Sequence, residues 1–172
     1  MLALTFQNEL AQVGDLSGDL VRFNAQKRFA GYRRALEAAG IAFDPTLMSM
    51  SGYSFESGFA AMEDLLARST GRFTAIFAVS LLTAAGAINA LRKHKVSVPE
   101  EISVVRYHDG LLARVMSPSL STISFPLDEM GRIAARGIID IIDGTTDELS
   151  VVVPGGIVVQ RESTMAIRPF RR

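Results

Sequence analysis

The sequence predicts an α/β fold with a mostly parallel sheet flanked by helices on both faces. Strand-like and helix-like segments alternate from end to end, and no internal repeat or low-complexity tract interrupts them. Of the 172 residues, 48% are apolar, which is typical of a folded chain with a core of ordinary size. Because strands that alternate with helices form right-handed βαβ units, parallel strands are expected.

The first fifty residues are predicted to hold two strands and one helix. Residues 2–6 form a short apolar strand, and residues 7–22, which are rich in glycine, are predicted to be a loop. Asn24 is expected to cap a helix that Gly40 ends in a left-handed conformation. Residues 45–50 are predicted to be a second strand.

The middle of the chain continues the alternation. Ser54 is expected to cap a helix that ends near Gly71. The uncharged residues 73–91 are long enough to span a membrane, but their β-branched first part and Ala-rich second part favour a buried strand followed by a packed helix, in a soluble chain. The elements that follow are a strand at 102–107, a short helix at 110–116 and a strand at 120–125.

The last third begins with a strongly amphipathic helix that Gly144 ends. Two strands, at 149–153 and 156–161, are predicted to follow it, separated by a turn at Pro154 and Gly155. The predicted organisation is an effector-binding lobe at 1–124, a crossover helix with returning strands at 125–165, and a tail at 166–172.

Several polar side chains follow the predicted parallel strands, at the edge where open α/β sheets bind ligands. Arg28 could offer a guanidinium fork to hydroxyls or a carboxylate, and Tyr53 a flat face to a ring. Ser80, His108 and Asp109 add short polar contacts. Each residue alone also fits an ordinary structural role, as a solvated arginine, a core tyrosine or a polar loop pair. It is their shared edge that favours a site for a small polar ligand.

The composition and motifs argue against several other functions. There are 18 basic and 18 acidic side chains and no cysteine. These residues therefore have no net positive charge for binding DNA and no thiolate for catalysis or metal binding. The motifs of serine hydrolases, zinc proteases and P-loop enzymes do not occur, and neither His94 nor His108 has a partner at metal-ligand spacing. We therefore expect no enzyme, no cofactor and no metal.

Several motifs, in order and in register, resemble the LacI/GalR-type transcriptional regulators. They cover about residues 24–165 and comprise RFAGYRRAL at 28–36, GYSFESGF at 52–59, IFAVSLLTAAGAINAL at 76–91, VPEEISVV at 98–105, YHD at 107–109, PSLSTI at 118–123, Met130-Gly131 and VQREST at 159–164. The resemblance implies a periplasmic-binding-protein-like fold, in which two lobes close on a small effector. It also implies a dimer that binds operator DNA through a helix-turn-helix headpiece, with the effector shifting the population between two states.

The resemblance also implies roles for individual residues. Arg28 matches a ligand-contacting arginine, Tyr53 a ring that stacks on the ligand, Ser80 a contacting asparagine, and His108 the first aspartate of an Asp-Asp pair that continues at Asp109. Three further residues are implicated: Arg22 and Asn24 in a loop that adds contacts, and Arg106 in place of a usual glycine.

The departures from the family pattern point to an acidic effector. A neutral His108 offers at most one acceptor where the family has a carboxylate, and Arg106 adds a cation. We therefore expect a sugar acid or phosphorylated sugar, or a site that has lost its ligand. A clear preference for a neutral hexose would contradict this hypothesis.

The stretch that resembles the family does not include the headpiece or most of the first lobe. The chain is therefore expected to be a sensor lobe in the cytoplasm, either as a fragment or as a truncated gene product. DNA would be reached only through the missing headpiece, and no membrane partner is expected. Two alternatives stay open: a stand-alone binding or dimerisation module, and a sugar-binding protein of the same fold. The apolar face of the last helix would lie exposed, and self-association through residues 127–160, or repacking of that helix onto the sheet, is predicted; the face comprises Leu127, Met130, Ala134, Ile138 and Ile141.

Overall fold

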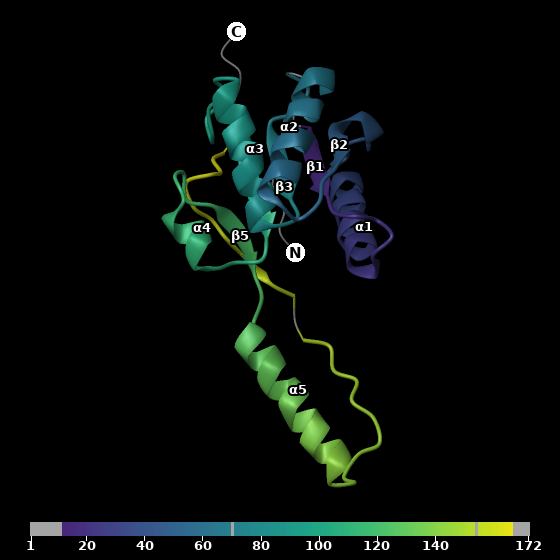
Figure 1. Cartoon of the computed structure of the whole chain (residues 1–172). Helices are drawn as coiled ribbons and strands as arrows, with labels where there is room; N and C mark the ends of the chain where they lie inside the picture. Colours follow the sequence, from purple (N-terminus) through teal and green to yellow (C-terminus); the bar gives the residue numbers. More distant parts are fainter. Residues whose placement is uncertain (1–11, 70, 154, 167–172) are drawn as a thin grey trace.

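The computed structural model describes residues 12–69, 71–153 and 155–166, and its centre is a six-stranded sheet of order β2-β1-β3-β4-β5-β6. The first five strands are parallel, and β6 runs antiparallel to β5 (Figure 1). The strands are β1 (Val13–Ser17), β2 (Met48–Met50), β3 (Ala75–Ala78), β4 (Ser103–Tyr107), β5 (Ser121–Ser124) and β6 (Ile157–Val159). The predicted α/β class with a mostly parallel sheet is confirmed.

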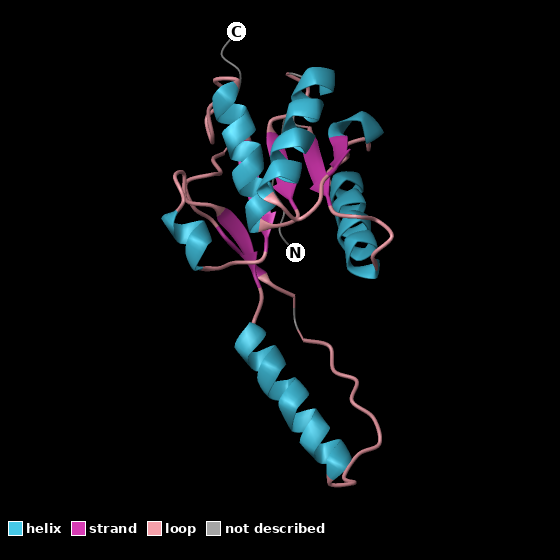
Figure 2. Cartoon of the chain, viewed as in Figure 1, coloured by secondary structure: helices cyan, strands magenta, loops and turns pink. Residues whose placement is uncertain are grey.

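Helices connect the parallel strands and lie on both sides of the sheet (Figure 2). They are α1 (Phe23–Ala38), the short 3-10 helix η1 (Pro45–Leu47), α2 (Phe55–Ser69), α3 (Leu81–Lys93), α4 (Leu111–Val115) and α5 (Leu127–Ile142). Leu16 of β1 belongs to the core cluster that includes Leu65 of α2. Successive strand residues point to opposite faces, so Asp15 faces the other side, where it interacts with Arg28 of α1.

The core lies between the sheet and the pair α2 and α3. Two glycines bring these helices close together. A Cβ on Gly86 would lie 2.1 Å from the backbone oxygen of Phe55, and one on Gly58 would lie 2.4 Å from the backbone oxygen of Thr83. Only residues without a side chain permit this backbone contact.

The helix boundaries largely match the predictions from sequence. Ser54 accepts a hydrogen bond from the Ser57 amide, which confirms it as a cap of α2. Gly40 and Gly144 have φ values of 70° and 68°, as expected for left-handed helix stops. Asn24 is not a cap, because α1 begins at Phe23 and Arg22 occupies the cap position without a side-chain hydrogen bond.

Two strand assignments from sequence are wrong. Residues 7–22 were predicted to be a loop, but β1 lies within them, because a glycine at position 14 fits the close contact with Ile76 of β3. Residues 149–153 form no strand, because no described strand lies beside them. The predicted strand at 2–6 and Pro154 of the predicted turn lie outside the described residues.

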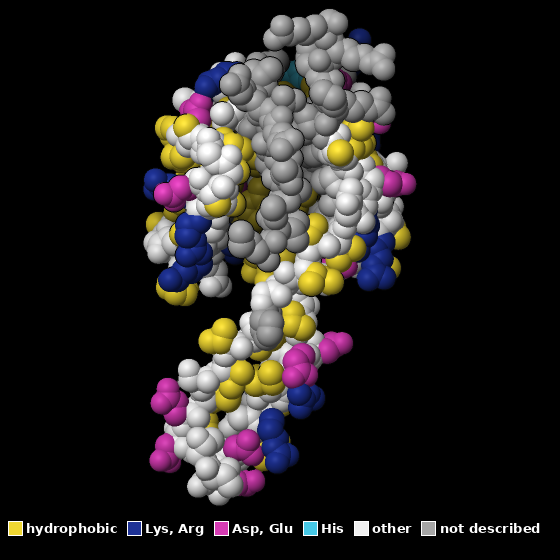
Figure 3. All heavy atoms as spheres, turned by 180° about the vertical axis from the view of Figure 1, so that it is seen from behind, with side chains coloured by type: hydrophobic (Ala, Val, Ile, Leu, Met, Phe, Trp, Pro, Cys, Tyr) yellow, Lys and Arg dark blue, Asp and Glu magenta, His cyan; other side chains and the backbone are white. Residues whose placement is uncertain are grey.

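Helix α5 and the segment that returns from it project away from the sheet (Figures 1 and 2). Hydrophobic side chains gather along this projection (Figure 3). The apolar residues exposed on it by 40% or more are Leu127, Met130, Ile138, Ile139, Ile141, Ile142, Leu149, Val151 and Val152. The apolar face of the helix is exposed, so the predicted repacking onto the sheet is wrong, and self-association, the other predicted outcome, stays a prediction.

Candidate functional site

An arginine of α1, the tyrosine that follows β2 and the tyrosine that ends β4 come together at the carboxyl edge of the sheet. Nη2 of Arg28, on α1, donates a hydrogen bond of 3.0 Å to the hydroxyl of Tyr53, which follows β2. The Arg28 guanidinium also lies 5.0 Å from the ring centre of Tyr107, the last residue of β4. We call Arg28, Tyr53 and Tyr107 the ring cluster. Its cation and aromatic faces suit a polar ring.

A buried carboxyl lies close to the ring cluster. Asp15 on β1 is 2% exposed and accepts a hydrogen bond from the Ser17 hydroxyl. Burial raises the pKa of Asp15 to about 6, against the opposing effects of the Ser17 hydrogen bond and the charge of Arg28. A carboxyl with this pKa changes its protonation state close to neutral pH.

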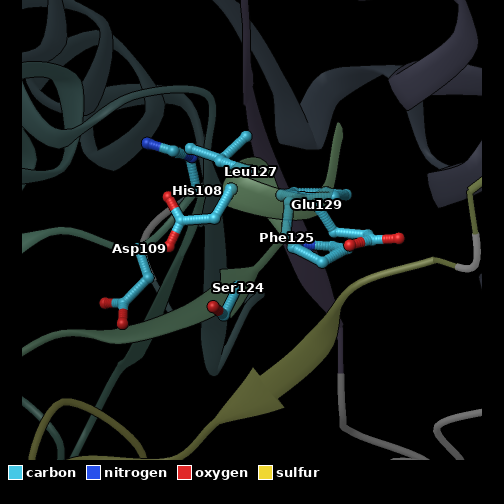
Figure 4. Close-up of a pocket in the computed structure, with 8 residues that line it drawn as sticks. His108, Asp109, Ser124, Phe125, Leu127 and Glu129 are labelled. Carbon is cyan, nitrogen blue, oxygen red and sulfur yellow. The ribbon is translucent and has the colours of Figure 1, made fainter. Parts of the chain in front are cut away.

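His108 and Asp109 lie in the loop after β4 and line a pocket of about 480 Å³ with residues at the start of α5. Figure 4 shows these residues around one hollow, with the Asp109 carboxylate pointing away from Leu127. His108 has a φ of 75°, a left-handed conformation that turns the chain sharply between β4 and α4. The other lining residues are Ser124, Phe125, Pro126, Leu127, Asp128 and Glu129.

The Asp109 carboxylate is held by a partly buried network. Nη2 of Arg161 lies 2.9 Å from both of its oxygens, and the Thr122 hydroxyl donates to it at 2.9 Å. Burial alone raises the pKa of Asp109, but the hydrogen bonds from Thr122, the Gly110 backbone and Arg161 hold the pKa below its ordinary value. Asp109 is therefore ionised and neutralises Arg161.

Arg106 of β4 lies beside this network and is 5% exposed. Burial lowers its pKa, Asp109 opposes that effect, and the charge of Arg161 adds to it. We call Arg106, Asp109, Thr122 and Arg161 the arginine cluster. It lies at the same edge of the sheet as His108 and the pocket.

Three predicted site residues lie elsewhere or have other partners. The Ser80 hydroxyl caps α3 by accepting from the Thr83 amide at 3.1 Å and contacts the Thr83 hydroxyl at 2.9 Å. Arg22 and Asn24 are exposed at the start of α1, and their side chains make no hydrogen bond or ion pair with the described residues. Their contact with a ligand stays a prediction.

Sequence reasoning missed three residues of the two clusters, Tyr107, Thr122 and Arg161, which occur there only within the motifs that carry the resemblance. It also missed Asp15, which falls in a predicted loop. Arg161 lies 52 residues from Asp109, and no local pattern indicates their pairing. A strand assignment at 13–17 would place Asp15 in the sheet, two residues before the carboxyl end of its strand.

The described residues contain neither a candidate metal site nor a helix that could span a membrane. They contain no group of three or more His, Asp or Glu side chains that could hold a metal ion. Across 12–69, 71–153 and 155–166, no helix has the length and apolarity needed to cross a membrane.

A parallel sheet with aromatic and guanidinium groups at its carboxyl edge defines a ligand-binding α/β lobe. Comparison with known proteins agrees with this class. A family model described as a periplasmic binding protein-like domain matches residues 8–164. The chain therefore belongs to the periplasmic binding protein-like domain family, in the form found in LacI-type transcriptional regulators.

The relatives are transcriptional regulators. The ribose operon repressor of Haemophilus influenzae is 34% identical over 157 residues, which are 91% of this chain and 47% of the repressor. The regulator CelR of Thermobifida fusca is 39% identical over 138 residues, covering 80% and 40% of the two chains. A solved structure of a CelR–cellobiose complex has a TM-score of 0.83 and 35% identity, over 90% of this chain and 47% of that one. The chain thus spans about half the length of the relatives it matches.

Proposed function

We propose that this chain is the effector-sensing lobe of a LacI-type regulator and that it binds a small polar ring compound at the carboxyl edge of its sheet. The ring cluster carries the proposal. Tyr53 is 44% exposed, so its face is open to a ligand, while Arg28 holds its hydroxyl at 3.0 Å. A ring can stack on such a face while guanidinium N–H groups bind its hydroxyls.

The site is proposed for binding rather than for catalysis. The two charged groups beside the pocket loop, Asp109 and Arg161, neutralise each other through a partly buried ion pair. His108 has no carboxylate partner within salt-bridge distance among the described residues, so it lacks the orienting group of a catalytic base. We infer a cytoplasmic regulator, not an enzyme, that acts on DNA through a headpiece outside these residues.

The relatives suggest the effector class. One is named a ribose operon repressor, and another is solved with cellobiose. A sugar or sugar derivative is therefore the proposed effector. The remaining predicted contacts, at Arg22, Asn24, Ser80 and His108, belong to this proposal as secondary positions around the same edge.

Binding of sugars to the isolated chain tests the proposal. Titration with ribose, cellobiose, gluconate and glucose 6-phosphate would be followed by amide NMR shifts, which detect weak binding. Tyr53→Ala should weaken binding of the active sugar at least about tenfold, as expected for removal of a stacked ring and its hydrogen bond. Arg34→Gln, on an exposed face of α1, is the control and should leave the affinity unchanged. An active sugar that binds Tyr53→Ala as tightly as the native chain would contradict the site.

The exposed face of α5 favours a second candidate function, that of a dimerisation module. It would act by pairing with another copy or with a longer relative. The two functions differ in their dependence on ligand: a pure dimerisation module associates equally with and without sugar, whereas a sensor lobe shows sugar-dependent shifts at Tyr53 and Tyr107.

A further inference from the structure

Arg106 is an unusual residue for its position in the sheet. It lies on β4, paired with Ala78 of β3 and Thr122 of β5, and only 5% of it is exposed. Its Nε is fully buried and has no hydrogen-bond partner within the part of the chain that the structure describes. Burying an arginine in this way costs free energy unless something pairs with its charge.

The neighbouring carboxylate does not supply that pairing. Asp109 already accepts from Arg161 and Thr122, and Arg161 also donates to the Leu120 carbonyl at 2.6 Å and the Thr122 hydroxyl at 3.1 Å. Among the described residues no carboxylate lies within 4 Å of Arg106. The arginine cluster thus holds two guanidinium groups and one carboxylate, which leaves an excess of positive charge.

Gly110 provides access to the unpaired guanidinium. A Cβ on this exposed residue would lie 3.6 Å from Nη2 of Arg106, and among the described residues none other than its chain neighbours comes within 4 Å of that position. Gly110 has a φ of 174°, which any residue can adopt, so backbone strain does not require glycine here. Because the residue lacks a side chain, Nη2 of Arg106 faces a space beside the loop of His108 and Asp109 that no other described side chain fills.

We propose that Arg106, reached through the opening at Gly110, binds an anionic group of the effector, a phosphate or a carboxylate. This inference rests on the proposed function and names the chemical class of the effector. A guanidinium donates two parallel hydrogen bonds to either group, and the bound anion balances the excess charge of the arginine cluster.

Thermal unfolding in matched salts tests the anion site. The midpoint would be measured in sodium chloride, phosphate and acetate at equal ionic strength, for the native chain, Arg106→Met, Gly110→Val and the control Arg34→Met. Phosphate or acetate should raise the midpoint of the native chain and of Arg34→Met above its value in chloride. Arg106→Met should lose this rise, and Gly110→Val should lose it while keeping the arginine.

A purely structural role for Arg106 gives a different pattern. If Arg106 only supports the fold, Arg106→Met lowers the midpoint in chloride; if it is a binding residue, that variant is more stable than the native chain in chloride, because an unpaired buried charge has been removed. The affinity for inorganic phosphate, measured by NMR titration, should fall at least about tenfold in Arg106→Met, as expected from losing a charge-assisted hydrogen bond.

The outcomes separate this inference from the proposed function. If phosphate and acetate act on the native chain no differently from chloride, or act equally on Arg106→Met and Gly110→Val, the anion site is wrong. Binding of a neutral sugar that depends on Tyr53 would still support the sensor function in that case. Anion binding at Arg106 without any sugar binding at the ring cluster would contradict the sensor function instead.

Discussion

Asp15 is buried, and its partners, the Ser17 hydroxyl and the charge of Arg28, do not offset the cost of burying its charge. This balance determines its effect on stability. The carboxyl is 2% exposed and its pKa is raised to about 6 by burial. The folded state therefore binds a proton more tightly than the unfolded state, in which the pKa is near 3.8. The contribution of Asp15 to stability is complete below that unfolded value and is lost as the pH rises through about 6.

Asp15→Asn should remove this pH dependence. At pH 8 the variant is expected to be more stable than the native chain by about 3 kcal/mol, the free energy that corresponds to a shift of roughly two pH units. At pH 4 the two chains should differ little. Urea unfolding of both chains from pH 4 to 8 measures this difference. Asp147→Asn, at an exposed position, serves as control, and a difference independent of pH would contradict the role of Asp15.

Unlike ionised Asp15, the ionised Asp109 should stabilise the folded chain at neutral pH. Its side chain and that of Arg161 are each 13% exposed, so Asp109→Asn leaves the buried Arg106 and the mostly buried Arg161 without their carboxylate. We expect a loss of roughly 3–5 kcal/mol in unfolding free energy at pH 7. Because the folded pKa of Asp109 is lowered, the difference should shrink as the pH falls below about 4.

The control for Asp109 is an ion pair of the same type on the surface. Asp140→Asn breaks the 3.3 Å contact with Arg136 on α5, where the two side chains are 36% and 73% exposed. Its loss should stay below about 1 kcal/mol. Equal losses in both variants, measured by urea unfolding, would show that the Asp109 network does not act as a buried pair.

At this scale, sequence reasoning found the residues that a general rule of parallel sheets could place. Arg28 and Tyr53 follow different strands, and the carboxyl edge brings them to 3.0 Å. The same rule placed His108 and Asp109 at that edge, in the loop after β4. It could not identify Arg161, whose position depends on β6 returning beside β5, or the role of Ser80, whose hydroxyl bonds its own helix.

Among the elements, the α2–α3 pair depends most directly on particular residues. Gly86→Ala would place a Cβ 2.1 Å from the Phe55 carbonyl, a backbone atom that cannot move without shifting α2. We expect a loss of at least about 1–3 kcal/mol, typical of overpacking. Gly31→Ala on α1 is the matched control, because no described residue beyond its chain neighbours and its own helix backbone lies within 4 Å of its Cβ position.

The control should change stability in the opposite direction. Alanine favours a helix over glycine by up to about 1 kcal/mol, so Gly31→Ala should stabilise the chain slightly. Thermal unfolding of both variants measures the pair of effects. A Gly86→Ala chain as stable as the native one would mean that the two helices can separate without cost.

Helices were easier to predict than strands for a physical reason. A helix is specified by local features, such as the Ser54 cap and the left-handed Gly40, and these were correct. A strand needs neighbours, so β1 was missed where Gly14 packs against Ile76, and residues 149–153 were assigned as a strand although no described strand pairs with them.

The whole molecule consists of a packed sheet lobe and the projecting α5 with its returning segment (Figure 1). The projection packs mainly against itself, since Leu149 of the returning segment lies against Gly137 of α5. Charged residues on its polar face form the ion pairs Glu129–Arg132 and Arg136–Asp140. Its apolar face is exposed, and an exposed apolar surface of this kind is typical of an interaction site.

We expect two copies of the chain to associate through this apolar face. Ile138 and Ile142 are 56% and 77% exposed and stand one helical turn apart, so they would lie at the centre of a helix–helix contact. Val152, 94% exposed, lies in the segment that returns from α5 and would add apolar surface to the contact. A stable contact of this type needs about 1,000 Å² of buried surface in total.

Light scattering coupled to size-exclusion chromatography, over a wide range of concentration, measures the association. The native chain should rise from a mass of 18.6 kDa toward twice that value as concentration increases. Ile138→Lys combined with Ile142→Lys should keep the monomer, because two desolvated ammonium groups would oppose the contact. Ala35→Lys, on an exposed position of α1, adds a charge away from the face and should dimerise like the native chain. A native chain that stays monomeric at every concentration would contradict the prediction and would leave the α5 face for a different partner, whereas dimers that survive both lysines would place the contact elsewhere on the molecule.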